Sequence, residues 1–177
     1  MSLCGMTESR RGYDMTVRAA LAARTRTRIL EAVIALTGET PLTAVTLPRV
    51  AERADVTVQT VLRNFGSRDG LFRSGLEYAS ARVVAERTVD PDDLDASLAA
   101  LVDHYERTST MMLLLLGQES WEPMAAEITT GGKALHREWV LQVFAHSLRP
   151  LVARERTEAV DLLVVATDLY TYKLLRL

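Results

Sequence analysis

The sequence predicts an all-α fold, and three observations support this prediction. Apolar residues recur at the i, i+3, i+4, i+7 spacing of a helix along most of the 177 residues. No segment alternates apolar and polar residues as a half-buried strand does, and no repeat of fixed period occurs. Short clusters of Gly, Pro, Ser, Thr and Asp interrupt the helical pattern where caps and turns are needed. We therefore expect an N-terminal three-helix domain followed by a C-terminal helical domain.

The composition is that of an ordinary globular protein. Hydrophobic residues make up 48% and charged residues 25% of the sequence, which suffices for a buried core. The longest apolar run, Met111 to Leu116, is too short to cross a bilayer, and the N-terminus lacks the apolar core of a signal peptide. We expect a cytoplasmic protein without a membrane partner. The single cysteine, Cys4, excludes a disulfide framework, and no residue cluster indicates a metal or cofactor.

The N-terminal region is expected to contain a disordered tail, residues 1–15, and a helix from Thr16 to Leu36. The apolar stripe of that helix comprises Ile29, Leu30, Val33, Ile34 and Leu36. The polar residues before the stripe are Arg24, Thr25, Arg26 and Arg28. They either contact phosphates or form a solvated basic face, and the two readings stay open. Gly38 to Thr43, around Pro41, is expected to be a loop.

The stretch from Val45 to Leu71 carries the clearest pattern in the chain. Thr46 is a candidate N-cap, and Pro48 fits the first turn of a helix that begins at Leu47. The buried stripe of this helix comprises Leu47, Val50, Ala51 and Ala54. Asp55 tolerates the left-handed backbone that a tight turn between two helices needs. Two short helices are therefore expected to cross at this turn.

The second short helix is expected after Thr57, its candidate N-cap. Its apolar positions are Val58, Val61, Leu62 and Phe65, and its outer positions are Gln59, Thr60, Arg63 and Asn64. The outer residue types hydrogen-bond base edges or phosphates, and no carboxylate lies among them, as a helix in a major groove requires. Gly66 can end this helix, and Ser67 can cap the next one, which starts at Arg68.

Residues Thr46 to Leu71 resemble the DNA-binding segment of the tetracycline-repressor (TetR) family. The resemblance rests on a capped helix ending in AERA, a turn into V-T, a short recognition helix and the run F-G-S-R-D-G-L. It covers about the first third of the chain and no motif beyond it. This chain departs from the commonest pattern with Asp55 and Gln59 in place of Gly, Leu62 in place of Tyr and Asn64 in place of His. The family's Tyr and His usually touch phosphates, so Leu62 has no such role here.

The charge distribution agrees with a nucleic-acid-binding N-terminal half. Residues 1–82 contain 12 Lys and Arg against 8 Asp and Glu, a balance of +4. Residues 83–177 contain 9 against 15, a balance of −6, so the two halves sum to the net charge of −2. Binding to a phosphate backbone by counterion release requires a basic surface, and the basic half is the one with the helix-turn-helix pattern.

The rest of the chain is expected to form a linking helix and a second domain. The expected domain limits are 16–67 for the helix-turn-helix domain, 68–90 for the linking helix and 91–177 for the C-terminal domain, with a boundary around Pro91. Further helices are expected from Asp92 or Asp93 to about Arg107, from Met124 to Thr130, from Lys133 to Leu148 and from Glu155 to Leu177. Gly131-Gly132 should stop the second of these helices, and the apolar segment after Thr110 must be enclosed.

The resemblance implies a transcriptional regulator, most often a repressor, that binds a palindromic DNA operator as a homodimer. The residues expected to contact bases are Gln59, Thr60 and Arg63, and those expected to contact phosphates are Thr46, Thr57, Asn64 and Arg68. Pairing is expected through the C-terminal helices, mainly Glu155 to Leu177, whose apolar stripe is wider than one core needs. The resemblance also implies a further helix after Leu177. The alternative is a helical protein-interaction module without specific DNA binding.

The resemblance further implies a small hydrophobic effector in the C-terminal domain. The candidate ligand-binding residues are His104, Tyr105, Met111, Met112, Trp121 and Trp139, with Gln118 and His136 as further polar anchors. Each of them can instead be a core residue, and each histidine can be hydrogen-bonded locally. No GxSxG, HExxH, CxxC or phosphate-loop pattern occurs, so we expect no enzyme and no catalytic or metal site.

Overall fold

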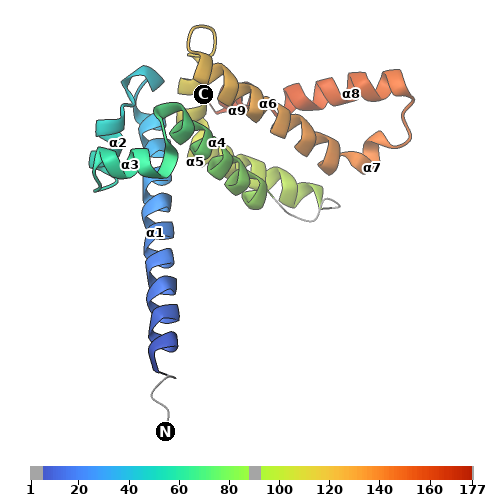
Figure 1. The fold of residues 1–177 in the computed structure, drawn as a ribbon. Coiled ribbons are helices and arrows are strands. Elements are labelled where there is room, and N and C mark those ends of the chain that lie inside the picture. The colour runs from blue at the N-terminus through green and yellow to red at the C-terminus, as the bar shows by residue number, and fades with distance from the viewer. Residues whose placement is uncertain (1–5, 88–92, 177) are drawn as a thin grey trace. The chain divides into compact units, whose positions relative to one another are not determined.

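The computed structural model describes residues 6–87 and 93–176, and within these ranges all regular structure is helical (Figure 1). The expected all-α fold is therefore confirmed. The chain divides into two compact units: the first contains residues up to Leu36 and Val45–Gly75, and the second contains Thr37–Ala44 and residues from Leu76 onward. The boundary expected around Pro91 lies outside the described residues, and the limits 16–67, 68–90 and 91–177 stay a prediction.

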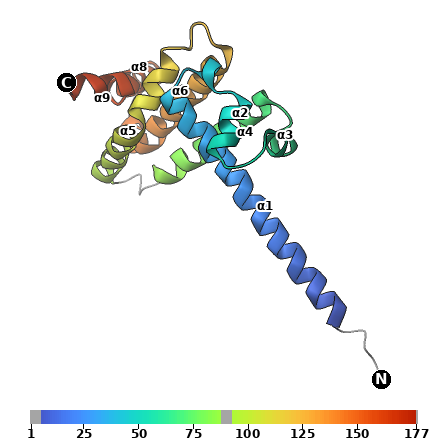
Figure 2. The same cartoon turned by 90° about the vertical axis from the view of Figure 1, so that its left-hand side faces the viewer.

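The first unit contains most of α1 (Met6–Glu39), together with α2 (Leu47–Arg53), α3 (Val58–Phe65) and the beginning of α4 (Arg68–Glu86). Figures 1 and 2 both show α2 and α3 beside the C-terminal part of α1. Residues from all four helices are buried: Ile29, Leu30, Val33, Val50, Ala51, Val61, Leu71 and Phe72. The stripes expected for the short helices are confirmed only in part: Val50, Ala51, Ala54 and Val61 are buried, whereas Leu47, Val58, Leu62 and Phe65 are only half-buried.

Helix α1 differs from the expectation at both ends. It begins at Met6 rather than Thr16, so the expected disordered tail of residues 1–15 is helical from Met6 onward. It also continues to Glu39, three residues past Leu36. Extending a helix that is already anchored costs little, since each added residue contributes one hydrogen bond without a new nucleation step. Pro41 is the first proline of the chain and stops further extension.

The second unit contains the 3₁₀ turn η1 (Leu42–Ala44), the end of α4, and five further helices. These are α5 (Leu94–Leu116), α6 (Pro123–Val143), α7 (Ala145–Leu148), α8 (Ala153–Ala166) and α9 (Leu169–Leu175). Helix α6 packs against α5 and α8, and α9 packs against α5. The buried apolar cluster between them comprises Leu101, Tyr105, Trp139, Val140, Leu148, Val160 and Leu169. No described helix is long and apolar enough to span a bilayer.

Three helix limits in the second unit correct the expectations. Helix α5 is continuous from Leu94 to Leu116 and does not end near Arg107. Helix α6 runs through Gly131-Gly132, because packing outweighs a cost of about 1 kcal/mol per glycine. The final expected helix is instead divided into α8 and α9 at Asp168, whose carboxylate accepts a hydrogen bond from the Tyr170 amide at 2.8 Å. An N-cap of this kind starts a new helix in a new direction.

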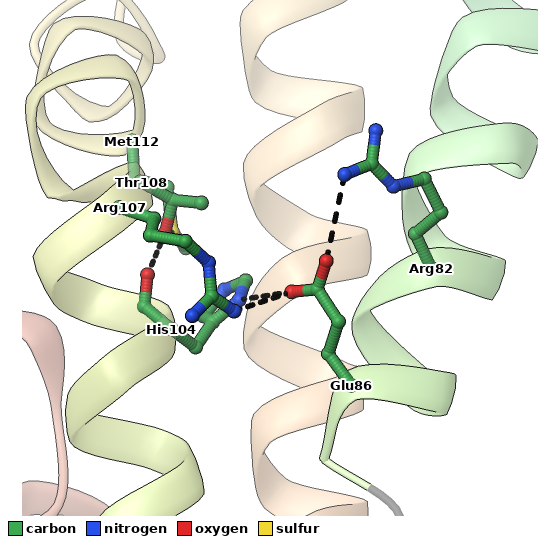
Figure 3. A network of polar contacts seen from close by, with 6 residues as sticks. All are labelled: Arg82, Glu86, His104, Arg107, Thr108 and Met112. Carbon is green, nitrogen blue, oxygen red and sulfur yellow. Dashed lines mark hydrogen bonds and ion pairs between the residues drawn. The ribbon is translucent and has the colours of Figure 1, made fainter.

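Glu86, at the end of α4, contacts three basic side chains, and two of them, His104 and Arg107, belong to α5 (Figure 3). One of its carboxylate oxygens, Oε2, lies 2.9 Å from Arg107 Nη2 and 3.4 Å from His104 Nδ1, and the other, Oε1, lies 3.5 Å from Arg82 Nη2. His104 is buried, whereas both arginines are more than half exposed. Burial, followed by the nearby charge of Arg87, lowers the pKa of His104 to about 4. His104 is therefore neutral near pH 7.

We predict an acid-dependent loss of stability from this histidine. The folded pKa of His104, about 4, lies below its ordinary value of 6.5, so the unfolded chain takes up the proton first as the pH falls. The free energy of unfolding should fall between pH 6.5 and pH 4, by on the order of 2 kcal/mol at pH 5. Urea unfolding of the wild type and His104→Gln at pH 7 and pH 5 tests this. An equal pH effect in both proteins would contradict the prediction.

Candidate nucleic-acid interface

The turn between α2 and α3 is built as the sequence predicts. Asp55 has φ 51°, the left-handed backbone expected for it. The Val56 amide then donates to the Ala51 carbonyl at 2.9 Å and closes the first helix. Thr57 caps the second helix, since its hydroxyl accepts from the Thr60 amide at 3.1 Å. The crossing of the two helices is thus held by hydrogen bonds at both helix ends.

Helix α3 turns one face inward and another to solvent. Val61 is fully buried, and the side chains of Gln59 and Arg63 are exposed. Gln59 and Arg63 stand four residues apart and are therefore neighbours on the helix surface. Both carry donors in the geometry that suits base edges, because an Arg pairs with guanine and a Gln with adenine in the major groove. We take this exposed pair as the centre of the candidate interface.

Two further predicted contact residues on α3 are occupied by hydrogen bonds within the helix. Thr60 is half-buried, and its hydroxyl lies 2.9 Å from that of Thr57. Asn64 is also half-buried, and its side-chain amide donates to the Thr60 carbonyl at 2.8 Å. These bonds fix the side chains beside the exposed pair. Contacts of Thr60 with bases and of Asn64 with phosphate stay predictions.

Arg26 of α1 fixes the C-terminal end of α3. Its guanidinium donates to the Asn64 carbonyl at 2.9 Å and to the Ser74 hydroxyl at 3.3 Å, and it lies 4.3 Å from the centre of the Phe65 ring. A cation at this position satisfies a free carbonyl and complements the helix dipole. Arg26 thus has a structural role, while Arg24 and Arg28 are exposed on the same helix.

Arg68 holds the corner between α3 and α4. Its Nε donates to the Val45 carbonyl at 3.1 Å, and its guanidinium lies 4.6 Å from the centre of the Phe72 ring. Ser67 caps α4, as expected, by accepting from the Gly70 amide at 3.0 Å. Gly66 ends α3 with φ 75°, which glycine adopts without strain. A phosphate contact by Arg68 remains a prediction beside this structural role.

The remaining two predicted phosphate contacts lie at helix starts. Thr46 and Thr57 are both exposed, immediately before α2 and α3. Thr46 has the extended backbone of an N-cap, but its side chain makes no capping hydrogen bond, so that expectation was wrong. Pro48 lies in the first turn of α2 and has no amide hydrogen to be capped there. The Thr46 hydroxyl is therefore not committed to a capping bond.

The predicted effector residues do not share one site in the second unit. Tyr105 and Trp139 belong to one buried cluster, and Met112 packs against it. His104 is buried next to Tyr105, with ring centroids 6.0 Å apart. Met111 lies instead against the α1 end, since a Cβ on Gly38 would be 3.2 Å from the Met111 Cβ. Trp121 is 56% exposed. The candidate set therefore separates into an interior group and two outlying residues.

The polar anchors suggested for the effector have different roles. Gln118 is structural: its carbonyl oxygen accepts from the Leu42 amide at 2.8 Å, and its amide donates to the Leu114 carbonyl at 2.7 Å. His136 is buried, with Nε2 3.1 Å from the Thr167 hydroxyl. Burial, followed by the charge of Arg87, lowers the pKa of His136. His136 thus remains a candidate anchor, and Gln118 does not.

Among the described residues, four buried side-chain atoms of the second unit make no hydrogen bond: Arg87 Nε, Ser97 Oγ, His136 Nδ1 and Trp139 Nε1. Unsatisfied buried polar atoms are uncommon and each needs an explanation. His136 and Trp139 were predicted from the sequence as ligand-binding residues, whereas Arg87 and Ser97 were not. The signal for Arg87 was its place four residues after Val83, where it continues an apolar stripe. Among the described residues, no cluster of His, Cys, Asp and Glu could hold a metal ion.

Comparisons with known proteins agree with this geometry. Residues 29–74 match the model for bacterial regulatory proteins of the tetR family. An HTH-type transcriptional repressor of Streptomyces coelicolor is 28% identical over 100 residues, which span 56% of this chain and 50% of the relative. The chain therefore matches only half the length of that relative.

Two solved structures share the fold over most of the chain. A transcriptional regulator of Rhodococcus sp. Rha1 has a TM-score of 0.59 and 22% identity, covering 81% of this chain and 79% of that one. Salmonella enterica GusR has a TM-score of 0.64 and 15% identity, and the match covers 87% of this chain and 88% of the GusR chain. At these identities the likeness supports the helical architecture of both units and nothing finer.

Gly70 provides a test of the corner that orients α3. A Cβ added at Gly70 would lie 2.2 Å from the Phe65 carbonyl oxygen, a backbone atom that cannot move without shifting α3. We predict that Gly70→Ala lowers the free energy of unfolding by about 1–3 kcal/mol. The control is Gly131→Ala in α6, where a Cβ meets nothing within 4 Å, and which should gain up to about 1 kcal/mol. Urea unfolding measures both, and a Gly70→Ala protein as stable as the wild type would contradict the corner geometry.

Proposed function

We infer that this chain, which belongs to the tetR family of bacterial regulatory proteins through its N-terminal domain, is a DNA-binding transcriptional regulator. The observation that carries the proposal is the exposed pair Gln59 and Arg63 on α3, a capped helix that buries Val61. That arrangement suits insertion into a major groove with α3 as the recognition helix. The curated relative is a repressor, which favours repression as the output here.

The proposed contacts divide into base readers and phosphate contacts. Gln59, Thr60 and Arg63 are proposed to face the bases. The proposed phosphate contacts are Thr46, Thr57, Asn64 and Arg68. Thr46 and Thr57 flank α2 and α3 at their exposed starts, where hydroxyls can donate to phosphate oxygens. Since phosphate contacts release counterions, the affinity for DNA should fall as the salt concentration rises.

The regulator is proposed to act as a homodimer on a palindromic operator. Three large apolar side chains of α8 and α9 support this, because Leu162, Val165 and Leu174 are each more than 60% exposed. Exposed apolar surface of this kind marks an interface when it is contiguous with the core of a helical bundle. Two copies would present their recognition helices to successive major grooves about 34–36 Å apart.

A small hydrophobic effector bound in the second unit is proposed to release the operator. The interior group of Tyr105, Trp139, Met112 and His104 supplies an apolar and aromatic surround. Met111 and Trp121 are proposed as outer contacts only. An effector that binds more tightly to the conformation with low operator affinity stabilises that conformation and so lowers operator affinity. The coupling free energy between two such sites is typically about 1–3 kcal/mol.

The test of the proposed function begins with selection of binding sequences from random duplex DNA. The selected duplex and a scrambled duplex are then titrated at several salt concentrations. We expect an inverted repeat to be selected, tighter binding to it than to the scrambled duplex, and affinity that falls with salt. Failure to select any sequence, with no salt-dependent binding, would favour a protein-interaction module instead.

We predict that Arg63→Ala weakens binding to the selected duplex by about 1–3 kcal/mol while leaving the fold intact. The side chain is exposed, so its loss removes a base contact and no core packing. The matched control is Arg154→Ala, which removes an equal charge from an exposed side chain of α8. Fluorescence anisotropy measures both proteins on selected and scrambled duplexes. Equal weakening on both duplexes would make Arg63 a phosphate contact and not a reader.

We predict that a double variant, Leu162→Asp with Val165→Asp, converts the protein to a monomer. Carboxylates on the exposed stripe of α8 would have to be desolvated in a dimer interface and would repel their symmetry mates. Sedimentation velocity measures the oligomeric state, with Gln142→Asp on exposed α6 surface as the control. A variant that sediments as the wild type does would place the dimer interface elsewhere.

A further inference from the structure

We propose that the interior of the second unit binds a small amphipathic carboxylate through Arg87, with Trp139 and His136 completing the polar contacts. The inference rests on the proposed function, because it names the chemical class of the effector. It places the charged group of that effector on a residue that the sequence pattern did not single out.

Arg87 is a buried cation without a buried anion. It is 9% exposed, and its Nε makes no hydrogen bond. The Tyr105 ring lies beside it, with the guanidinium carbon 5.6 Å from the ring centre, and the Tyr105 side chain favours the charged guanidinium. No carboxylate in the described ranges forms an ion pair with Arg87; the charge of the neighbouring Glu86 favours the cation, but the Glu86 carboxylate is bonded to Arg82, His104 and Arg107. A guanidinium stays charged in proteins, so a ligand anion is the natural partner for it.

The neighbouring side chains form a linked group. The Tyr105 hydroxyl donates to the Thr167 carbonyl at 3.0 Å, and burial raises the pKa of Tyr105 to about 12, so the phenol stays neutral. The Thr167 hydroxyl donates to the Leu163 carbonyl at 2.7 Å and lies 3.1 Å from His136 Nε2. Because that hydroxyl hydrogen is used, His136 Nε2 must be the protonated ring nitrogen. His136 Nδ1 is then a buried acceptor without a donor.

Trp139 adds a second buried donor. Its ring stacks on His136, with centroids 5.7 Å apart, and meets Phe144 edge-on at 6.3 Å. Its Nε1 makes no hydrogen bond and is buried. The group therefore offers two N–H donors, one of them cationic, and a single acceptor, all surrounded by apolar and aromatic side chains. Charge-assisted hydrogen bonds from such donors suit a carboxylate, and the surround suits an apolar tail.

Other ligand classes fit this group less well. A cationic ligand would be repelled by Arg87, and none of Tyr105, His136 and Trp139 offers an anionic oxygen to it. A neutral ligand would leave the buried guanidinium without an ion-pair partner. A carboxylate compensates that charge and accepts from the two free N–H groups. The predicted discrimination is therefore between a carboxylate and its own amide, which has the same shape.

The first measurement needs no ligand. Arg87→Met keeps most of the side-chain volume and removes the buried charge, so we expect its thermal midpoint to equal or exceed that of the wild type. Trp139→Phe keeps the aromatic packing and removes only the free N–H, so it should behave similarly to the wild type. A fall in the midpoint of Arg87→Met below that of the wild type would assign Arg87 a structural role and overturn the proposal.

The second measurement uses benzoate, phenylacetate and 4-phenylbutyrate, each with its neutral amide, in calorimetric titrations of the full chain. At least one carboxylate should bind the wild type at least about tenfold more tightly than its amide. Arg87→Met should lose at least about tenfold for that carboxylate, and Trp139→Phe should lose less. The matched control is Arg82→Met, an exposed arginine on α4 beside the same Glu86, which should bind as the wild type does.

The outcomes separate this inference from the proposed function. The inference fails when none of the three carboxylates binds, when the amides bind equally well, or when Arg87→Met retains the affinity. Binding of the same protein to the selected duplex is measured without these compounds. If the protein binds the selected duplex but none of the carboxylates, the proposed function is retained and only the carboxylate site is rejected. Carboxylate binding by a protein that selects no DNA would support this site and contradict the proposed DNA-binding function.

Discussion

The placement of α3 depends on one interaction set, the contact of Arg26 with the end of that helix. Eight residues are too few for a helix to be stable alone, so α3 keeps its direction only through what packs against it. Arg26 binds the Asn64 carbonyl and covers the Phe65 ring, while Val61 is buried below. The Asp55 turn and the Arg68 corner then fix the two ends. The exposure of Gln59 and Arg63 follows from these contacts.

Much of the first unit could be predicted from the sequence because its signals are local. The caps at Thr57 and Ser67, the left-handed Asp55 and the helix end at Gly66 each depend on neighbours within a few residues. The role of Arg26 could not be predicted, since its partners lie 38 and 48 residues away. From sequence it was one of several arginines with two possible roles, and only the fold distinguishes it from Arg24 and Arg28.

The second unit was predicted less well because its helix ends are set by packing. Gly131-Gly132 is a helix-breaking pattern in isolation, yet α6 continues through it. The division at Asp168 depends on one capping bond within an apolar segment. Buried polar residues were harder still, because Arg87 and a surface arginine look alike in a single sequence. Burying a guanidinium whose Nε makes no hydrogen bond costs stability, and departures of this kind are most common at functional sites.

The central claim is that Arg63 on α3 reads a base, and one measurement tests it most directly. Each guanine of the selected duplex is replaced in turn by 7-deazaguanine, which lacks the N7 acceptor that an arginine contacts. We predict that replacement at one symmetry-related pair of guanines weakens DNA binding by the wild type and does not further weaken DNA binding by Arg63→Ala. If every 7-deazaguanine replacement weakened binding by Arg63→Ala as much as it weakens binding by the wild type, the proposed base contact of Arg63 would be contradicted.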